Sequence, residues 1–188
     1  MTNLTRFQRH MVYFAKPGTH QITLLSSIKA SLALGLDFPV ACALSIGMRV
    51  LYAPFPYLSP INISSITPGQ SRSQLEHAPD NQQYYSRADL VRSYWQSPRE
   101  VGMVHTILDL MHVVSFWAIA ADVRTGLVDA DTLRAFQQGE WQQGVVRRRK
   151  SRRRDVGEVL PLWRGGPIIV SGHSWFVKTL FGVRVYEP

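Results

Sequence analysis

Three prolines within seven residues restrict the fold of this chain more than any other feature of its sequence. They lie at positions 54, 56 and 60 and follow a segment, 38–48, that contains no charged residue. Proline fixes its own backbone torsion and disfavours a helical conformation in the residue before it. The sequence therefore predicts an apolar segment that ends in a proline reversal.

This apolar segment is too short to span a membrane as a helix. A spanning helix needs roughly 20 apolar residues, and Asp37 and Pro39 interrupt any longer version of the segment. Two interpretations fit its length. It is either a hairpin that dips into one lipid leaflet, with Arg49 reaching back to the surface, or a core helix followed by a rigid loop.

Residues 7–35 have the outline of a helix, a loop and a second helix. Apolar side chains recur on one face of the first helix, and the Lys-Pro-Gly-Thr-His sequence at 16–20 is typical of a turn. Ser26 or Ser27 can cap the second helix. A loop of this length between two helices predicts the outline of an EF-hand.

The loop lacks the ligands that calcium requires. In a calcium loop that begins at Ala15, positions one, three, five and twelve are Ala15, Pro17, Thr19 and Ser26. The sequence contains no Asp or Glu between residues 1 and 36. Calcium is therefore not expected as a cofactor.

His10 lies in the first helix, next to Phe7 and Phe14 on the helical wheel. This position predicts a half-buried imidazole. From the residues alone, a histidine that packs between helices is the simplest interpretation.

The basic character of the chain is concentrated in one run. The formal net charge is +8, and seven of the positive charges lie within residues 147–154, so the remainder is close to neutral. We expect this run to be a solvated tract, at which each basic residue near an anionic lipid surface contributes about 1 kcal/mol. Nucleic acid is not an expected partner, because no nucleic-acid-binding motif accompanies the run.

The remaining composition is typical of one intracellular domain. A chain of 188 residues is long enough for a single core. The only cysteine, Cys42, cannot form a disulfide framework. The polar residues 1–9 are not followed by the apolar run of a signal peptide, so an intracellular location is expected.

Residues typical of helix caps and helix ends predict two further helices. Ser86 precedes a segment with Asp89 three residues later, which is the spacing of a capping box. Further along, Gly126 can end one helix, and Asp129 or Asp131 can cap the next.

Residues 104–123 form a second strongly apolar segment, too continuous for a surface helix. Its histidines, His105 and His112, share a helical face with Asp109. These three residues could form a metal-binding face or an acid–base relay. The alternative is a set of satisfied polar residues inside an apolar helix, because two histidines seven residues apart are wider than one ion usually bridges.

The order of these features resembles that of the caleosins, also called plant and fungal peroxygenases. The resemblance spans about 7–141. It rests on the helix that contains His10, the twelve-residue loop, a second helix that ends at Gly35, the apolar segment with its prolines, and the segment 124–141. It implies a lipid-droplet or membrane-associated protein with one EF-hand and a haem.

The resemblance also implies that His10 is one of two haem ligands. The family's second histidine follows an Asn-Ile pair, where this chain has Ser64, and a later Lys-His-Gly-Ser-Asp motif is replaced here by Pro68-Gly69. Neither serine nor proline can replace an imidazole on iron. His77 is the nearest possible substitute, although its neighbours are typical of a surface loop.

We therefore expect a mainly α-helical fold. It consists of a degenerate EF-hand helix pair, the apolar segment with its proline reversal, a later helical unit, and a short β-like tail after residue 163. The predicted boundaries are a caleosin-like domain at 1–141 and a basic linker with the C-terminal tail at 142–188.

Two functions follow from the resemblance. One is a peroxygenase-type oxidoreductase that acts on a hydrophobic substrate in lipid or specialised (secondary) metabolism, with His10 as the candidate haem ligand, no other metal ligand and no assigned catalytic residue. The other is a non-catalytic lipid-droplet or membrane-surface protein that has lost calcium and haem binding. Either would contact a lipid monolayer at a lipid droplet or at the endoplasmic-reticulum membrane.

Overall fold

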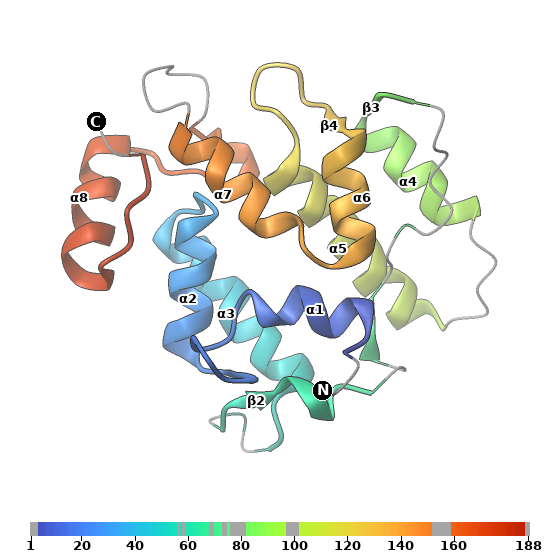
Figure 1. Cartoon of the computed structure of the whole chain (residues 1–188), viewed down its shortest axis with the longest axis horizontal. Coiled ribbons are helices and arrows are strands. Elements are labelled where there is room, and N and C mark those ends of the chain that lie inside the picture. Colours follow the sequence, from blue (N-terminus) through green and yellow to red (C-terminus); the bar gives the residue numbers. More distant parts are fainter. Residues whose placement is uncertain are drawn as a thin grey trace.

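The computed structural model describes residues 4–55, 57, 59–67, 70–72, 75, 82–96, 102–151 and 159–186. Helices dominate these ranges, which confirms the prediction of a mainly α-helical fold (Figure 1). In chain order the elements are α1 (Arg6–Val12), β1 (Gln21–Ile22), α2 (Leu24–Ala33), α3 (Phe38–Tyr52), β2 (Ile61–Asn62), η1 (Ile63–Ser65), β3 (Tyr84–Tyr85), α4 (Arg87–Gln96), α5 (Met103–Ala120), β4 (Val128–Asp129), α6 (Ala130–Gln138), α7 (Trp141–Ser151), η4 (Leu162–Arg164) and α8 (Val170–Phe181).

The short strands form two antiparallel pairs. β1 pairs with β2, with Ile22 opposite Ile61, and β3 pairs with β4, with Tyr85 opposite Val128. All four of these residues are buried. Each pair therefore ties two segments that are distant in the sequence through one buried apolar contact.

Two helix–loop–strand–helix units share the same backbone plan. In the first unit, which joins α1 to α2, the N–H of Lys16 donates to the carbonyl of Gln21 at 2.9 Å. In the second unit, which joins α5 to α6, the N–H of Asp122 donates to the carbonyl of Leu127, also at 2.9 Å. Thr23, which follows β1, caps α2, and Asp129, the last residue of β4, caps α6.

The cap of α2 differs from the expected one. Thr23, and neither Ser26 nor Ser27, is the N-cap residue. Its hydroxyl accepts from the N–H of Ser26 at 3.0 Å, and the Ser26 hydroxyl accepts from the N–H of Thr23 at 2.9 Å. Ser26 is therefore the third helical residue of a capping box, a role more often filled by Glu or Gln.

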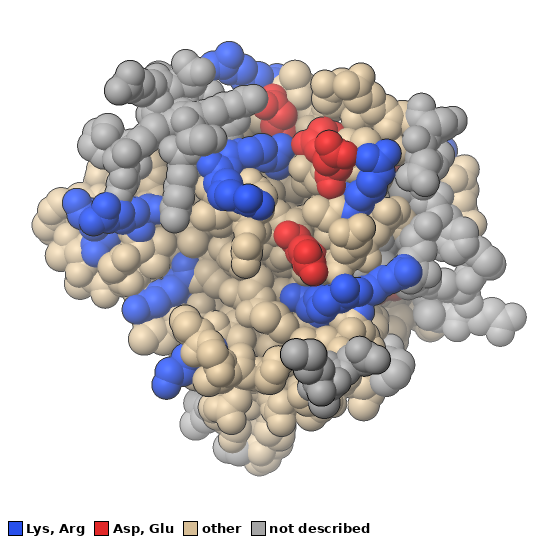
Figure 2. All heavy atoms as spheres, in the orientation of Figure 1, with Lys and Arg blue, Asp and Glu red and all other residues tan. Residues whose placement is uncertain are grey.

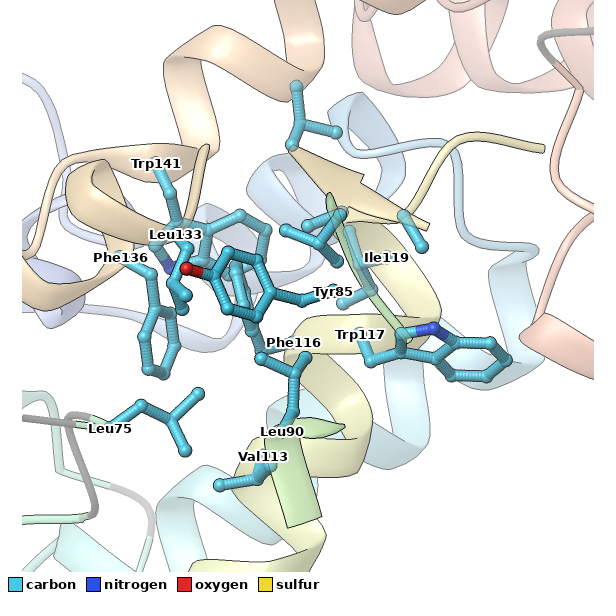
Figure 3. Close-up of a cluster of buried hydrophobic side chains, with 14 of the residues drawn as sticks. Leu75, Tyr85, Leu90, Val113, Phe116, Trp117, Ile119, Leu133, Phe136 and Trp141 are labelled. Atoms are coloured by element: carbon cyan, nitrogen blue, oxygen red, sulfur yellow. The ribbon is translucent and has the colours of Figure 1, made fainter. Parts of the chain in front are cut away.

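The largest apolar cluster lies where α4, α5, α6 and α7 meet (Figure 3). The rings of Phe116 and Phe136 stack with centroids 3.9 Å apart, and Trp141 meets Phe116 edge to face at 5.2 Å. The buried residues Val145 and Leu160 belong to the same cluster. Side chains on both sides of the predicted boundary at residues 141 and 142 therefore pack in one cluster.

The basic run is partly structural. Residues 147–151 belong to α7, while 152–154 lie outside the described residues. Arg149 is buried, and Arg148 and Arg149 donate to the carbonyls of Ala120 and Ile119 at the end of α5. A helix C-terminus attracts cations because its last carbonyls lack partners within the helix. Arg148 and Arg149 therefore bind the end of α5, whereas the sequence predicted a solvated tract.

The C-terminal tail is helical, which corrects the predicted β-like tail. Residues 170–181 form α8, which buries His173 and Val177, four residues apart on one face. Phe38 of α3 contacts the rings of Phe176 and Phe181 at 5.4 and 5.5 Å. Packing against α2 and α3 thus outweighs the β-branched and aromatic composition that favoured strands.

One polar contact fixes α8 to the start of α3. The Asp37 carboxylate caps α3 by accepting from the N–H of Phe38 at 2.8 Å, and it lies 3.1 Å from Nδ1 of His173. Burial lowers the pKa of His173 below its usual value, and the nearby Asp37 charge offsets part of that effect. The imidazole therefore favours its neutral form and donates from Nδ1.

Candidate functional site

The loop of the first unit is held closed by its own hydroxyl groups. Ser26, at the twelfth loop position, donates to the carbonyl of Phe14 at 2.8 Å, and Thr19 donates to the carbonyl of Lys16 at the same distance. Ala15 and Pro17 have no side-chain donor atoms for a cation. Within the described ranges, no three His, Cys, Asp or Glu side chains gather into a group that could hold a metal ion.

His10 is more deeply buried than its sequence position predicts. Only 3% of the residue is exposed. Its Nδ1 accepts a hydrogen bond from Nε1 of Trp141 at 3.0 Å, and its backbone carbonyl accepts from the Gln142 amide at 3.1 Å. The start of α7 thus fixes both the ring and the backbone of His10.

A close approach between backbones allows this contact. Gly139 ends α6 in a left-handed conformation, with φ of 89°. A Cβ atom at this position would lie 2.6 Å from the carbonyl oxygen of Arg6 in α1. Glycine therefore permits α1 to pack against the turn that precedes Trp141.

The structure brings His10 next to His112, a pairing that the sequence analysis missed. Their ring centroids lie 5.7 Å apart in an edge-to-face arrangement, and Phe136 contacts both rings at 4.7 and 5.3 Å. Phe7 contacts His112 at 5.9 Å. Helical spacing instead paired His112 with His105, which is exposed.

Asp109 is buried beside this pair and is balanced by a cation from a distant loop. Nη1 of Arg72 lies 3.9 Å from Oδ1 of Asp109, and Nε of Arg72 donates to the Tyr52 hydroxyl at 2.9 Å. Burial raises the pKa of Tyr52, and the Arg72 charge opposes that rise. Asp109 thus lies within ion-pair distance of Arg72.

The described residues around His10 do not fit a haem iron. Because the Trp141 indole can only donate, Nδ1 of His10 is the acceptor, and the proton of the neutral ring is on Nε2. A metal-ligating histidine usually has the opposite arrangement, in which its second nitrogen donates a hydrogen bond. Ser64, at the place of the family's second histidine, is exposed in η1, and His77 lies outside the described residues.

The outer face of α3 is apolar and exposed. It carries no charged or amide side chain over its length, and Val50 is 58% exposed. Its members repeat at intervals of three and four residues and are Pro39, Val40, Ala43, Ile46 and Val50. We refer to these five residues as the α3 stripe.

The proline reversal continues this apolar surface. Phe55, at the turn after α3, is 83% exposed, and Tyr57 next to it is exposed as well. The Arg49 guanidinium donates to the carbonyls of Tyr57 and Ser59 at 3.0 and 2.9 Å. Arg49 therefore ties the turn to the end of α3, where the sequence analysis expected it to reach for the surface.

Comparisons with protein-family models, with curated proteins and with solved structures give no match to this chain. The resemblance to the caleosins therefore rests on the sequence features described above.

Proposed function

We propose that this protein is a degenerate relative of the caleosins that binds the surface of lipid droplets or membranes through α3 and its proline turn. The observation that carries this proposal is the α3 stripe, an exposed helical face without charge that runs into the exposed ring of Phe55. An interfacial helix buries such a face at the boundary between headgroups and acyl chains.

The energetics favour removal of this surface from water. Each square ångström of apolar area removed from water contributes about 25 cal/mol, so burying one Val or Ile side chain contributes roughly 1.5–3 kcal/mol. Aromatic side chains such as Phe55 and Tyr57 suit the headgroup level, because their rings are apolar and the Tyr57 hydroxyl can remain hydrated. Arg49 would place a positive charge at the same level.

The proposed kinship draws support from the two helix–loop–strand–helix units. In each unit a loop leads into a short strand and a capped helix, as in an EF-hand, and β1 and β4 pair with β2 and β3 outside the units. In our proposal the α1–α2 unit is a degenerate EF-hand in which the hydroxyls of Ser26 and Thr19 close the loop in place of calcium ligands.

The peroxygenase alternative stays a prediction. A haem, when bound, would supply the oxygen-transfer chemistry, but the hydrogen bond from Trp141 to His10 leaves the imidazole in an unsuitable arrangement for iron. An absorption spectrum after incubation with haem tests this alternative, because a Soret band that His10→Ala abolishes would support it.

Flotation with phospholipid vesicles and with purified lipid droplets tests the lipid proposal. Replacing Ile46 and Val50 together by Gln removes two apolar anchors, and we expect the apparent affinity to fall at least tenfold. The matched control is Trp175→Gln with Leu180→Gln, because these exposed residues lie on α8. Unchanged binding by the α3 variant would contradict the proposal.

A further inference from the structure

α5 carries a second exposed apolar face. Met103 is 77% exposed, Met111 is 60% exposed and Ile107 is 50% exposed. Together with Val104 and Val114 we refer to these residues as the α5 stripe. Their principal spacings of four, four and three residues place them on one side of the helix.

The length and composition of α5 are unusual among the described helices. It is the one helix within the described ranges that is long and apolar enough to cross a membrane, and one third of it is buried inside the protein. The core helix of a soluble protein can be equally long and apolar, but such a helix is mostly buried. α5 instead buries Asp109, Val113 and Phe116 and leaves its other side in contact with solvent.

α3 and α5 are joined across α1. Phe7 contacts Tyr52 of α3 at 5.7 Å and His112 of α5 at 5.9 Å. Arg72 also joins them, through the Tyr52 hydroxyl at 2.9 Å and the Asp109 carboxylate at 3.9 Å. The end of α3 and the middle of α5 are therefore linked through Phe7 and Arg72.

Val50 of the α3 stripe and Val114 of the α5 stripe lie far around their helices from the side chains that contact Phe7. Side chains advance by about 100° per residue, so Val50 lies roughly 160° from Tyr52, and Val114 lies roughly 160° from His112. Tyr52 and His112 both point to Phe7. In Figure 1, α3 and α5 lie behind α1, α2 and α6, and Figure 2 shows Lys, Arg, Asp and Glu side chains on the near face. The helices that carry the two stripes thus lie on the far side of α1, α2 and α6 in this view.

We infer that the α5 stripe is a second lipid-contact helix and that it forms one lipid-facing surface with the α3 stripe. This inference rests on the proposed function. The two stripes contain no charged or amide side chain, whereas a specific protein interface usually combines an apolar centre with about ten hydrogen bonds. The flexible side chains of Met103 and Met111 adapt to irregular, fluid surroundings such as acyl chains.

An environment-sensitive fluorophore on a single cysteine tests the inference. In a Cys42→Ala background, the label is placed by Ile107→Cys on α5, by Ile46→Cys on α3, and by Trp175→Cys on α8 as the exposed control. Vesicles of phosphatidylcholine with a minor fraction of phosphatidylserine are then added. We expect a blue shift, and quenching by nitroxide-labelled acyl chains, at positions 107 and 46 and not at position 175.

The outcomes separate this inference from the proposed function. A response at position 46 without one at 107 would overturn the role of α5 and leave the function of α3 in place. No response at either position would overturn both proposals. A concentration-dependent shift at 107 without vesicles, together with a dimer on gel filtration, would assign the stripe to a second copy of the chain and overturn the lipid assignment.

A pair of substitutions gives an independent measurement. Ile107→Gln with Met111→Gln keeps helix-compatible side chains on a solvent-facing surface, so far-UV circular dichroism should match that of the unmodified protein. We expect vesicle affinity to fall at least threefold. Unchanged affinity would contradict the inference even if the α3 variant binds poorly.

Discussion

The two helix–loop–strand–helix units have the same backbone plan but hold their loops closed in different ways. In the first unit the neutral hydroxyl of Ser26, in the first turn of α2, donates to the carbonyl of Phe14, which precedes the loop. In the second unit the Asp122 carboxylate accepts from the N–H groups of Arg124 and Thr125 at 2.8 Å, and guanidinium groups donate to carbonyls at the end of α5. The comparison indicates that this plan can be stabilised by side chains of the protein itself, through either neutral or charged donors.

Arg164 is the central cation of the second unit. It is buried, and its guanidinium donates to backbone carbonyls of four residues, Trp117, Ala118, Ala121 and Asp122. It also stacks near the Trp117 ring, with Cζ 5.2 Å from the centroid. A helix C-terminus leaves its last carbonyls unsatisfied, and one planar side chain with five donors can satisfy several of them.

The largest expected effect is therefore that of Arg164→Met. The substitution leaves several buried carbonyls without donors, each at a cost of about 1–3 kcal/mol, so the free energy of unfolding should fall by about 3–4 kcal/mol. Urea unfolding followed by circular dichroism measures this change. Arg147→Met is the matched control, because Arg147 is exposed on α7 and its loss should cost less than about 0.5 kcal/mol. Similar losses in both variants would contradict the assigned role of Arg164.

The corresponding change in the first unit is Ser26→Ala. It removes the hydrogen bond to Phe14 and the side-chain half of the capping box with Thr23. We expect the free energy of unfolding to fall by about 1–2 kcal/mol, less than for Arg164→Met. Ser64→Ala controls for loss of an exposed hydroxyl. A larger loss for Ser26→Ala than for Arg164→Met would reverse the contrast between the units.

The Trp141–His10 hydrogen bond connects the first unit to α7, which follows the second. Trp141→Phe keeps an aromatic ring in the core and removes the indole donor, so we expect the free energy of unfolding to fall by roughly 1–2 kcal/mol. The imidazole 15N chemical shifts of His10 should also change, because Nδ1 loses its donor. If these shifts stay the same, His10 is not held by Trp141 in solution.

The sequence predicted local features better than the contacts between them. The capping box of Ser86 and Asp89 is present, with the N–H of Ser86 donating to Asp89 at 2.9 Å and the N–H of Asp89 donating to Ser86 at 3.3 Å. This motif lies within four residues, where local hydrogen bonding decides the conformation. The contact between His10 and His112 joins segments about 100 residues apart, and helical periodicity contains no information on it.

The sequence-based predictions that were wrong concern segments whose structure depends on contacts with distant parts of the chain. The tail at 168–177 is rich in β-branched and aromatic residues, but burial of His173 and Val177 against α2 and α3 selects a helix. The basic run was expected to be solvated because of its charge. Arg148 and Arg149 instead donate hydrogen bonds to carbonyls at the end of α5. Both outcomes depend on tertiary partners that a single sequence does not specify.

The smallest expected effect concerns α8, which packs on α2 of the first unit. Because the folded protein lowers the pKa of His173, the unfolded chain binds more protons between that lowered value and the ordinary value of about 6.5. The stabilising contribution of neutral His173 should therefore be complete above about pH 6.5. The free energy of unfolding should decrease as the pH falls through this window. Urea unfolding at several pH values should show a decline that is shallower in His173→Gln, which has no titratable group. An equal pH dependence in both proteins would mean that other groups control it, and the contact between Asp37 and His173 would then contribute nothing to the acid sensitivity of the first unit.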